Sequence, residues 1–129
     1  TTIRGGGTPR AERGERPDLT GPRTMLLAWD PVTNSEVWRA TGKGGNGGTL
    51  STAGNLVFWG TGNVMVAYDA QSGEELWSAE VGRNTATPAT YVLDGRQYIT
   101  IAGGSGGRND APRVTTFTLD ALSAADPGN

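Results

Sequence analysis

The sequence contains neither cysteine nor histidine. Without cysteine, the chain can form no disulfide, no thiol nucleophile and no cysteine-ligated zinc site. Without histidine, it can build no Ser-His-Asp triad, no histidine-ligated metal site and no histidine general base from its own residues. The two absences leave the chain without several of the side chains on which self-contained active sites depend.

The sequence also lacks a large excess of charge of either sign and long apolar runs. The 11 basic and 13 acidic residues give a net charge of -2, which does not match the basic footprint of a nucleic-acid-binding protein. No apolar run reaches the roughly 18 residues needed to cross a bilayer. The first 24 residues are polar and lack the apolar centre of a signal peptide. We therefore expect no nucleic-acid partner, no membrane span and no signal peptide in this chain.

Glycine is abundant, with 21 residues among 129, and four tryptophans accompany it. This composition favours a turn-rich β protein with a packed core. Residues 1–23 mix glycine, proline and charges of both signs, which indicates an irregular connection or long loop. Residues 123–129 are expected to form a tail or linker.

A structural repeat dominates the middle of the chain. The stretch LLAWDPVTNSEVW (Leu26 to Trp38) returns as MVAYDAQSGEELW (Met65 to Trp77) at a constant offset of 39 residues. Four short strands joined by tight turns and repeating at about 40 residues are typical of a β-propeller blade. The sequence therefore predicts an all-β fold of about two and a half four-stranded blades.

The predicted blades have definite bounds. Residues 24–41 form a partial blade, residues 48–82 a complete one, and residues 85–122 a second partial blade with an insertion at 103–112. A propeller closes with about four to eight blades. We therefore expect the chain to be a portion of a larger propeller, whose open edges pair with the remainder of that propeller or with another polypeptide.

The repeated unit has the form A-x-D-x-x-[TS]-[GN]-x-x-x-W, and its residues have predicted physical roles. The aspartate and the hydroxyl side chain can bind turn amides, and Gly73 or Asn34 tolerates a left-handed backbone. Each tryptophan would bury about 150 to 250 Å² between adjacent blades, with ligand stacking as the alternative. The expected docking residues are Ala28, Asp30, Trp38, Ala67, Asp69, Gly73 and Trp77.

The repeats resemble the tryptophan-docking motifs of eight-bladed quinoprotein propellers, and NGGTLSTAGNLVF (residues 46–58) resembles the C-terminal segment of the pyrroloquinoline quinone (PQQ) dependent alcohol dehydrogenases. The resemblance extends from Leu26 to about Leu119. It implies that the complete protein is a periplasmic enzyme that oxidises a primary or secondary alcohol by hydride transfer to the quinone. This chain would then be a C-terminal segment that forms one wall of the cofactor site.

By the same resemblance, Asn46, Gly47 and Gly48 lie beside PQQ, where glycines let the backbone approach a ligand and can form an anion-binding nest. The alternative is a crowded turn between blades without ligand contact. Gly45 stands where many relatives have tryptophan, and the Gly103–Gly107 cluster lacks the aromatic residue often found there.

The resemblance also implies partners and cofactors that this chain does not hold. The ligands of a calcium or lanthanide ion and the catalytic base lie on earlier blades in relatives, so no catalytic or metal-binding residue is assigned here. A haem c domain could follow, and a periplasmic cytochrome c is the expected electron acceptor.

Other interpretations remain open. A non-catalytic quinoprotein-like propeller that binds other proteins would use the same docking repeats. The G-x-G-x-x-G pattern from Gly42 to Gly47 is not followed by a helix pattern, which argues against a dinucleotide site. Asp110 in the insertion is expected to be a lone surface carboxylate.

Overall fold

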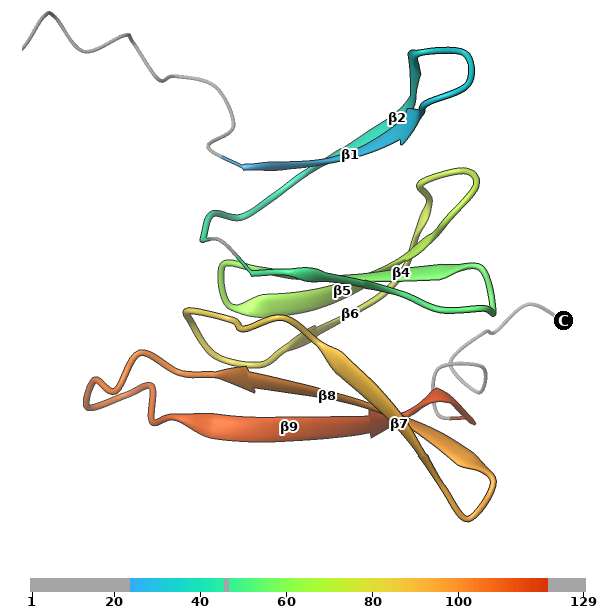
Figure 1. The fold of residues 1–129 in the computed structure, drawn as a ribbon. Coiled ribbons are helices and arrows are strands. Elements are labelled where there is room, and N and C mark those ends of the chain that lie inside the picture. Colours follow the sequence, from blue (N-terminus) through green and yellow to red (C-terminus); the bar gives the residue numbers. More distant parts are fainter. Residues whose placement is uncertain (1–23, 46, 121–129) are drawn as a thin grey trace, which may run out of the picture.

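The computed structural model describes residues 24–45 and 47–120, which form nine strands in three antiparallel sheets (Figure 1). The first sheet contains β1 (Met25–Asp30) and β2 (Ser35–Thr41). The second contains β3 (Thr49–Ser51), β4 (Leu56–Thr61), β5 (Val64–Asp69) and β6 (Glu75–Glu80). The third contains β7 (Ala89–Leu93), β8 (Arg96–Gly103) and β9 (Arg113–Thr118). The expected loop 1–23, Asn46, the end of the third blade at 121–122 and the tail 123–129 lie outside the described residues.

Each sheet is a meander in which consecutive strands pair with one another. Tight turns make this order possible, as between β7 and β8, where Asp94 and Gly95 have φ values of 51° and 75°. Positive φ at both central residues matches the right-handed twist of the flanking strands. The expected all-β fold is confirmed, with two, four and three strands in successive sheets.

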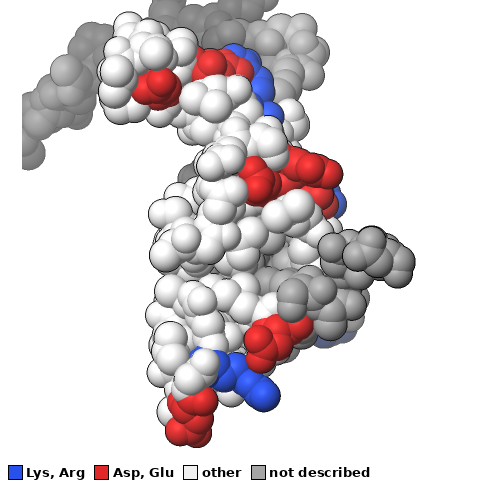
Figure 2. All heavy atoms as spheres, turned by 90° about the vertical axis from the view of Figure 1, so that its right-hand side faces the viewer, with Lys and Arg blue, Asp and Glu red and all other residues white. Residues whose placement is uncertain are grey.

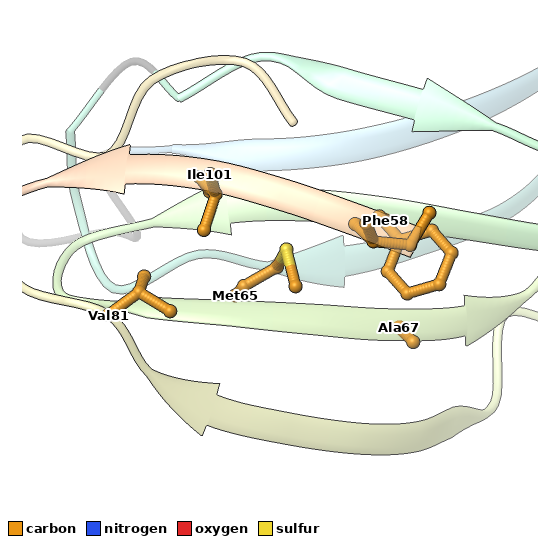
Figure 3. Packing of buried hydrophobic residues seen from close by; sticks show 6 residues of the cluster. Phe58, Met65, Ala67, Val81 and Ile101 are labelled. Carbon is orange, nitrogen blue, oxygen red and sulfur yellow. The ribbon is translucent and has the colours of Figure 1, made fainter. Parts of the chain in front are cut away.

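The sheets follow one another in chain order, and the core lies between their faces (Figure 1). Figure 3 shows Phe58, Met65 and Ala67 of the second sheet beside Val81 and Ile101. These side chains are at most 2% exposed, and Ile99 completes the cluster. Because successive strand residues point to opposite faces, the second sheet also buries a second cluster. It consists of Trp59, Val66 and Tyr68, packed against Leu26 and Ala40 of the first sheet.

Trp38 connects the first sheet to the second. Its indole nitrogen donates a hydrogen bond to the carbonyl oxygen of Ala70 at 2.9 Å. The centroid of its ring lies 6.0 Å from the centroid of the Tyr68 ring. A Cβ atom added at Gly73 would lie 2.6 Å from the Cδ2 atom of Trp38. The turn after β5 is therefore in close contact with the tryptophan that ends the preceding blade.

The turn after β1 is organised by Asp30. Its carboxylate accepts hydrogen bonds from the hydroxyl of Thr33 and the amide of Val32, both at 2.8 Å. These hydrogen bonds lower the pKa of Asp30, and the bond from the Thr33 hydroxyl has the largest effect. They do so because they favour the charged form of the carboxylate. Asn34 then takes a left-handed conformation with φ of 51°.

The turn after β5 repeats this arrangement around Asp69. Its Oδ1 atom accepts from the amides of Ser72 at 2.8 Å and Gln71 at 2.9 Å, and Oδ2 accepts from the carboxamide of Asn55 at 2.8 Å. The Ser72 amide is the largest cause that lowers the pKa of Asp69. Gly73 has φ of 73°. The two copies of the repeat therefore form two turns of the same kind.

Trp77 occupies the corresponding end of the second blade. Its Cα pairs across the sheet with Ala67, as Trp38 pairs with Ala28 in the first sheet. Its ring meets Phe117 of the third sheet edge-on, with centroids 4.8 Å apart. The residue that would match Ala70 in the third blade is Ala121, which lies outside the described residues.

Apolar side chains remain exposed on the two outer sheets. Trp29 and Leu27 of β1 are 51% and 44% exposed, and Val92 and Val114 of the third sheet reach 68% and 69%. Within residues 24–45 and 47–120, no helix is long and apolar enough to cross a membrane.

Candidate functional site

The glycine-rich connections of the chain meet at one end of the sheets, on the left in Figure 1. They are the segments 42–45, 47–48, 62–63, 81–88 and 104–112, named here the glycine end. The turns organised by Asp30 and Asp69 lie at the opposite end, named here the hairpin end. The expected docking turns thus lie at the opposite end of the strands from Gly47 and Gly48, two of the expected cofactor residues.

The connection after β2 is fixed to the turn between β4 and β5. The amide of Lys43 donates to the hydroxyl of Thr61 at 2.9 Å, and that hydroxyl donates to the carbonyl of Gly44 at 3.1 Å. The Gly62 amide donates to the same carbonyl at 2.5 Å. Thr61 is only 2% exposed. These buried bonds hold the backbone of Lys43 in a defined position.

Gly47 and Gly48 lie in close contact with the second sheet. Their carbonyl oxygens accept hydrogen bonds from the Trp59 indole at 3.2 Å and from the Gly60 amide at 3.3 Å. A Cβ atom at Gly47 would lie 1.9 Å from the Gly60 oxygen, and one at Gly48 would lie 2.0 Å from the Thr87 hydroxyl. No side chain fits at either position. Asn46 lies outside the described residues.

The hydroxyl of Thr85 adds an unsatisfied polar group to this region. Thr85 is 7% exposed, and its Oγ1 atom has no hydrogen-bond partner among the described residues. It is next to the backbone, because a Cβ atom at Gly47 or Gly60 would lie 2.6 or 2.8 Å from it. A buried hydroxyl without a partner costs about 1–3 kcal/mol. Thr85 is therefore a candidate donor or acceptor for a bound molecule.

A polar hollow of about 400 Å³ opens beside these connections. Lys43 and Arg83 line it together with Asn63, Asn84 and the backbone of three glycines. Gly44 and Gly45 among them have φ values of 98° and 78°. The hollow offers two cations and two carboxamides, and these groups suit an anion better than an apolar ligand.

Asp110 ties the insertion to the connection between the second and third sheets. Its Oδ2 atom accepts from the amides of Ser105 at 2.8 Å and Arg83 at 3.3 Å, and Oδ1 lies 4.0 Å from Arg113. Hydrogen bonding by Ser105, ahead of the other contacts, lowers the pKa of Asp110. The side chain is only 20% exposed. The expectation that this carboxylate is lone is therefore wrong, although aspartate in a Gly- and Asn-rich loop does signal such turn bonds.

The described residues bring together no three acidic side chains that could hold a metal ion. The carboxylates gather mainly at the hairpin end, which faces the viewer in Figure 2. The described part of the glycine end instead offers backbone groups, hydroxyls, carboxamides and cations, which can bind and orient a ligand.

Comparisons with known proteins identify the family that this chain resembles. The profile of the family described as "Glucose/ethanol/alcohol dehydrogenase, beta-propeller domain" (PQQ) matches residues 22–99. The 1-butanol dehydrogenase (cytochrome c) of Thauera butanivorans is 52% identical over 95 residues, which are 71% of this chain and 14% of that protein.

Solved structures give the same result for the fold. The quinohemoprotein alcohol dehydrogenase of Comamonas testosteroni superposes with a TM-score of 0.64 at 37% identity, over 79% of this chain and 18% of that one. A europium-containing methanol dehydrogenase gives a TM-score of 0.57 at 27% identity, over 62% and 15%. The expected propeller fold and the resemblance to PQQ-dependent alcohol dehydrogenases are confirmed.

The chain spans 14% of the length of the Thauera relative. The family profile nevertheless covers more than half of the chain, including both tryptophan-terminated repeats and the glycine run between them. The chain therefore belongs to the β-propeller domain family of the PQQ-dependent glucose, ethanol and alcohol dehydrogenases.

Proposed function

We propose that this chain is a segment of a PQQ-dependent dehydrogenase that oxidises a primary or secondary alcohol by hydride transfer to the quinone. The observation that carries the proposal is the family match over residues 22–99, which includes the run Asn46–Gly48. A relative over half identical in the matched region is named a 1-butanol dehydrogenase. The segment would form one wall of the cofactor site.

The residues of the glycine end fit part of this cofactor. PQQ is a planar tricyclic quinone with three carboxylates, and when bound it accepts the hydride that leaves the alcohol carbon. Gly47 and Gly48 present backbone without side chains, and their carbonyls are already bonded to the second sheet. The unpartnered Thr85 hydroxyl is next to this backbone. Gly45 supplies no flat aromatic surface, so that wall has to come from another part of the polypeptide.

The role of this chain is therefore positional. Gly47 and Gly48 fix the path of the backbone, and Thr85 supplies a hydroxyl that can bond a polar group. The catalytic base and the ligands of a calcium or lanthanide ion would lie on earlier blades. Periplasmic location and a haem c domain belong to the same proposal. A cytochrome c acceptor is supported by the name of the Thauera relative, which includes "cytochrome c".

The test is an assay of the complete polypeptide with PQQ, calcium or a lanthanide, 1-butanol and an artificial electron acceptor. We expect alcohol oxidation that depends on added cofactor. Gly48→Ala should lower PQQ affinity, because the new Cβ atom would collide with Thr87. Gly54→Ala is the matched control, since its Cβ atom would meet only the Thr52 hydroxyl at 3.7 Å. Absence of any PQQ-dependent oxidation would contradict the proposal.

A second function, a non-catalytic propeller that binds other proteins, is favoured by one observation. The close contacts of Gly47 with Gly60 and of Gly48 with Thr87 account for both glycines without any ligand. The absorption spectrum of the purified complete polypeptide separates the two functions, because a bound quinone absorbs at wavelengths where tryptophan does not. A protein that neither contains nor takes up PQQ would support the scaffold.

A further inference from the structure

We propose that the hollow lined by Lys43 and Arg83 binds a carboxylate group of a small organic anion. The inference rests on the proposed function only for the source of that carboxylate, which is either the cofactor or an anionic alcohol substrate. The hollow has a volume of about 400 Å³, which is large enough for a small organic molecule.

The two cations are not neutralised by the described part of the chain. The described salt bridges involve three other arginines, namely Arg39, Arg96 and Arg113. No described carboxylate lies within 4.0 Å of the Lys43 ammonium or the Arg83 guanidinium. Lys43 and Arg83 both line the hollow, so an anion bound there is attracted by both charges. A carboxylate can also accept two parallel hydrogen bonds from a guanidinium.

Both cations stand on backbone that is already fixed. The backbone amide of Lys43 donates a hydrogen bond to the Thr61 hydroxyl, and the adjacent Gly44 carbonyl accepts one from the Gly62 amide. Arg83 is held from both sides, because its amide donates to Asp110 and its carbonyl accepts from Gly104 at 2.6 Å. Preorganised backbone lowers the entropy cost of binding, although the two long side chains still have to be ordered.

The other groups around the hollow suit the same ligand. Asn63 and Asn84 contribute carboxamides, and no described group forms a hydrogen bond with either side chain. The carboxylates Glu80 and Asp110 line an adjoining hollow, which shares Asn63 and Arg83 with this one. Asp110 is also bonded to two amides and close to Arg113, which reduces its repulsion of an anion.

The difference in charge between the two ends of the strands also favours binding of an anion at the glycine end. The glycine end carries Lys43, Arg83 and Arg108 against the single carboxylate Asp110 among the described residues, and Glu80 and Arg113 lie at the adjoining strand ends. Figure 2 shows the hairpin end, where acidic side chains outnumber basic ones. An anion is therefore attracted to the glycine end and repelled from the hairpin end.

The first experiment titrates the cofactor-free complete polypeptide with citrate, a tricarboxylate without a quinone, by calorimetry at low salt. Replacing Lys43→Gln and Arg83→Gln together should weaken citrate binding by about 50-fold, and each single change by about five- to tenfold. The control is Arg39→Gln with Arg96→Gln, which removes the same charge from two surface ion pairs and should leave citrate binding unchanged.

The second experiment identifies the source of the carboxylate. If the hollow takes the cofactor, the double variant loses PQQ affinity, measured by tryptophan quenching, and PQQ-loaded protein no longer binds citrate. If it takes the substrate, PQQ affinity is unchanged. The KM for 4-hydroxybutanoate then rises in the double variant while the KM for 1-butanol does not. Protein that neither binds PQQ nor oxidises alcohols refutes the proposed function, but its citrate titration still tests the hollow. Citrate binding that is absent from the wild type, or equal in the wild type and the double variant, overturns the inference.

Discussion

Gly73 offers a measurement of how strongly the first blade is attached to the second. It lies in the turn after β5 with φ of 73°, and a Cβ atom there would be 2.6 Å from Cδ2 of Trp38. Gly95 has nearly the same φ, 75°, but a Cβ atom there would meet nothing within 4 Å. The pair Gly73→Ala and Gly95→Ala therefore separates backbone strain from the contact with Trp38.

The expected magnitudes follow from these two geometries. Alanine in a left-handed conformation costs about 1–2 kcal/mol, and this cost applies to both substitutions. At Gly73 the new methyl group also displaces the Trp38 ring. That movement breaks the 2.9 Å bond to Ala70, worth about 1 kcal/mol, and loosens the stacking on Tyr68, worth about another 1 kcal/mol. Gly73→Ala should thus cost about 2 kcal/mol more than Gly95→Ala.

The assay is thermal unfolding of the complete polypeptide, combined with amide hydrogen exchange of the segment 65–77. We expect a larger fall in Tm and faster exchange for Gly73→Ala than for Gly95→Ala. In a Trp38→Ala background the difference should disappear, since the steric partner is gone and the two sites are then uncoupled. Equal effects of the two glycine substitutions in the wild-type background would refute the proposed contact.

Two further predictions concern carboxylates. Turn hydrogen bonds, the Ser72 amide first, lower the pKa of Asp69 below its ordinary value of 3.8. The ionised Asp69 side chain therefore stabilises the folded state fully at pH values above 3.8. This stabilisation is lost as the pH falls through the lower pKa of the folded state. Asp69→Asn should therefore flatten the acid side of a Tm-against-pH profile, and an unchanged profile would contradict this. Asp110→Ala should speed hydrogen exchange in residues 104–112 while leaving β8 unchanged, with Asn109→Ala as the control; a uniform change would show that Asp110 supports the whole sheet instead.

The strands and their order could be predicted from the sequence because their signals are local. The alternation of apolar residues and the turn residues Asn34, Gly73 and Gly95 all act within a few positions of the chain. The 39-residue offset then shows that the same unit is built twice. These signals are sufficient for the number of strands in each sheet and for the fold family.

The contacts at the glycine end could not be predicted in the same way, because they join residues far apart in the chain. Gly48 contacts Thr87, and the Asp110 carboxylate accepts from the Arg83 amide 27 positions earlier. Such contacts depend on how successive sheets are placed, which no local pattern specifies. The hollow between Lys43 and Arg83 has the same origin, since its walls come from three separate connections.

The glycine run from Gly44 to Gly48 is divided between two physical requirements. Gly47 and Gly48 lack side chains because protein atoms already occupy the Cβ positions. Gly44 is glycine for its positive φ of 98°, and a Cβ atom there would meet nothing within 4 Å. Gly47 and Gly48 are therefore required for packing, whereas Gly44 and Gly45 border the open hollow beside Lys43. A ligand of the proposed kind reaches the run from the side of Gly44 and Gly45, so contact with Gly47 and Gly48 requires a molecule that extends past Gly45.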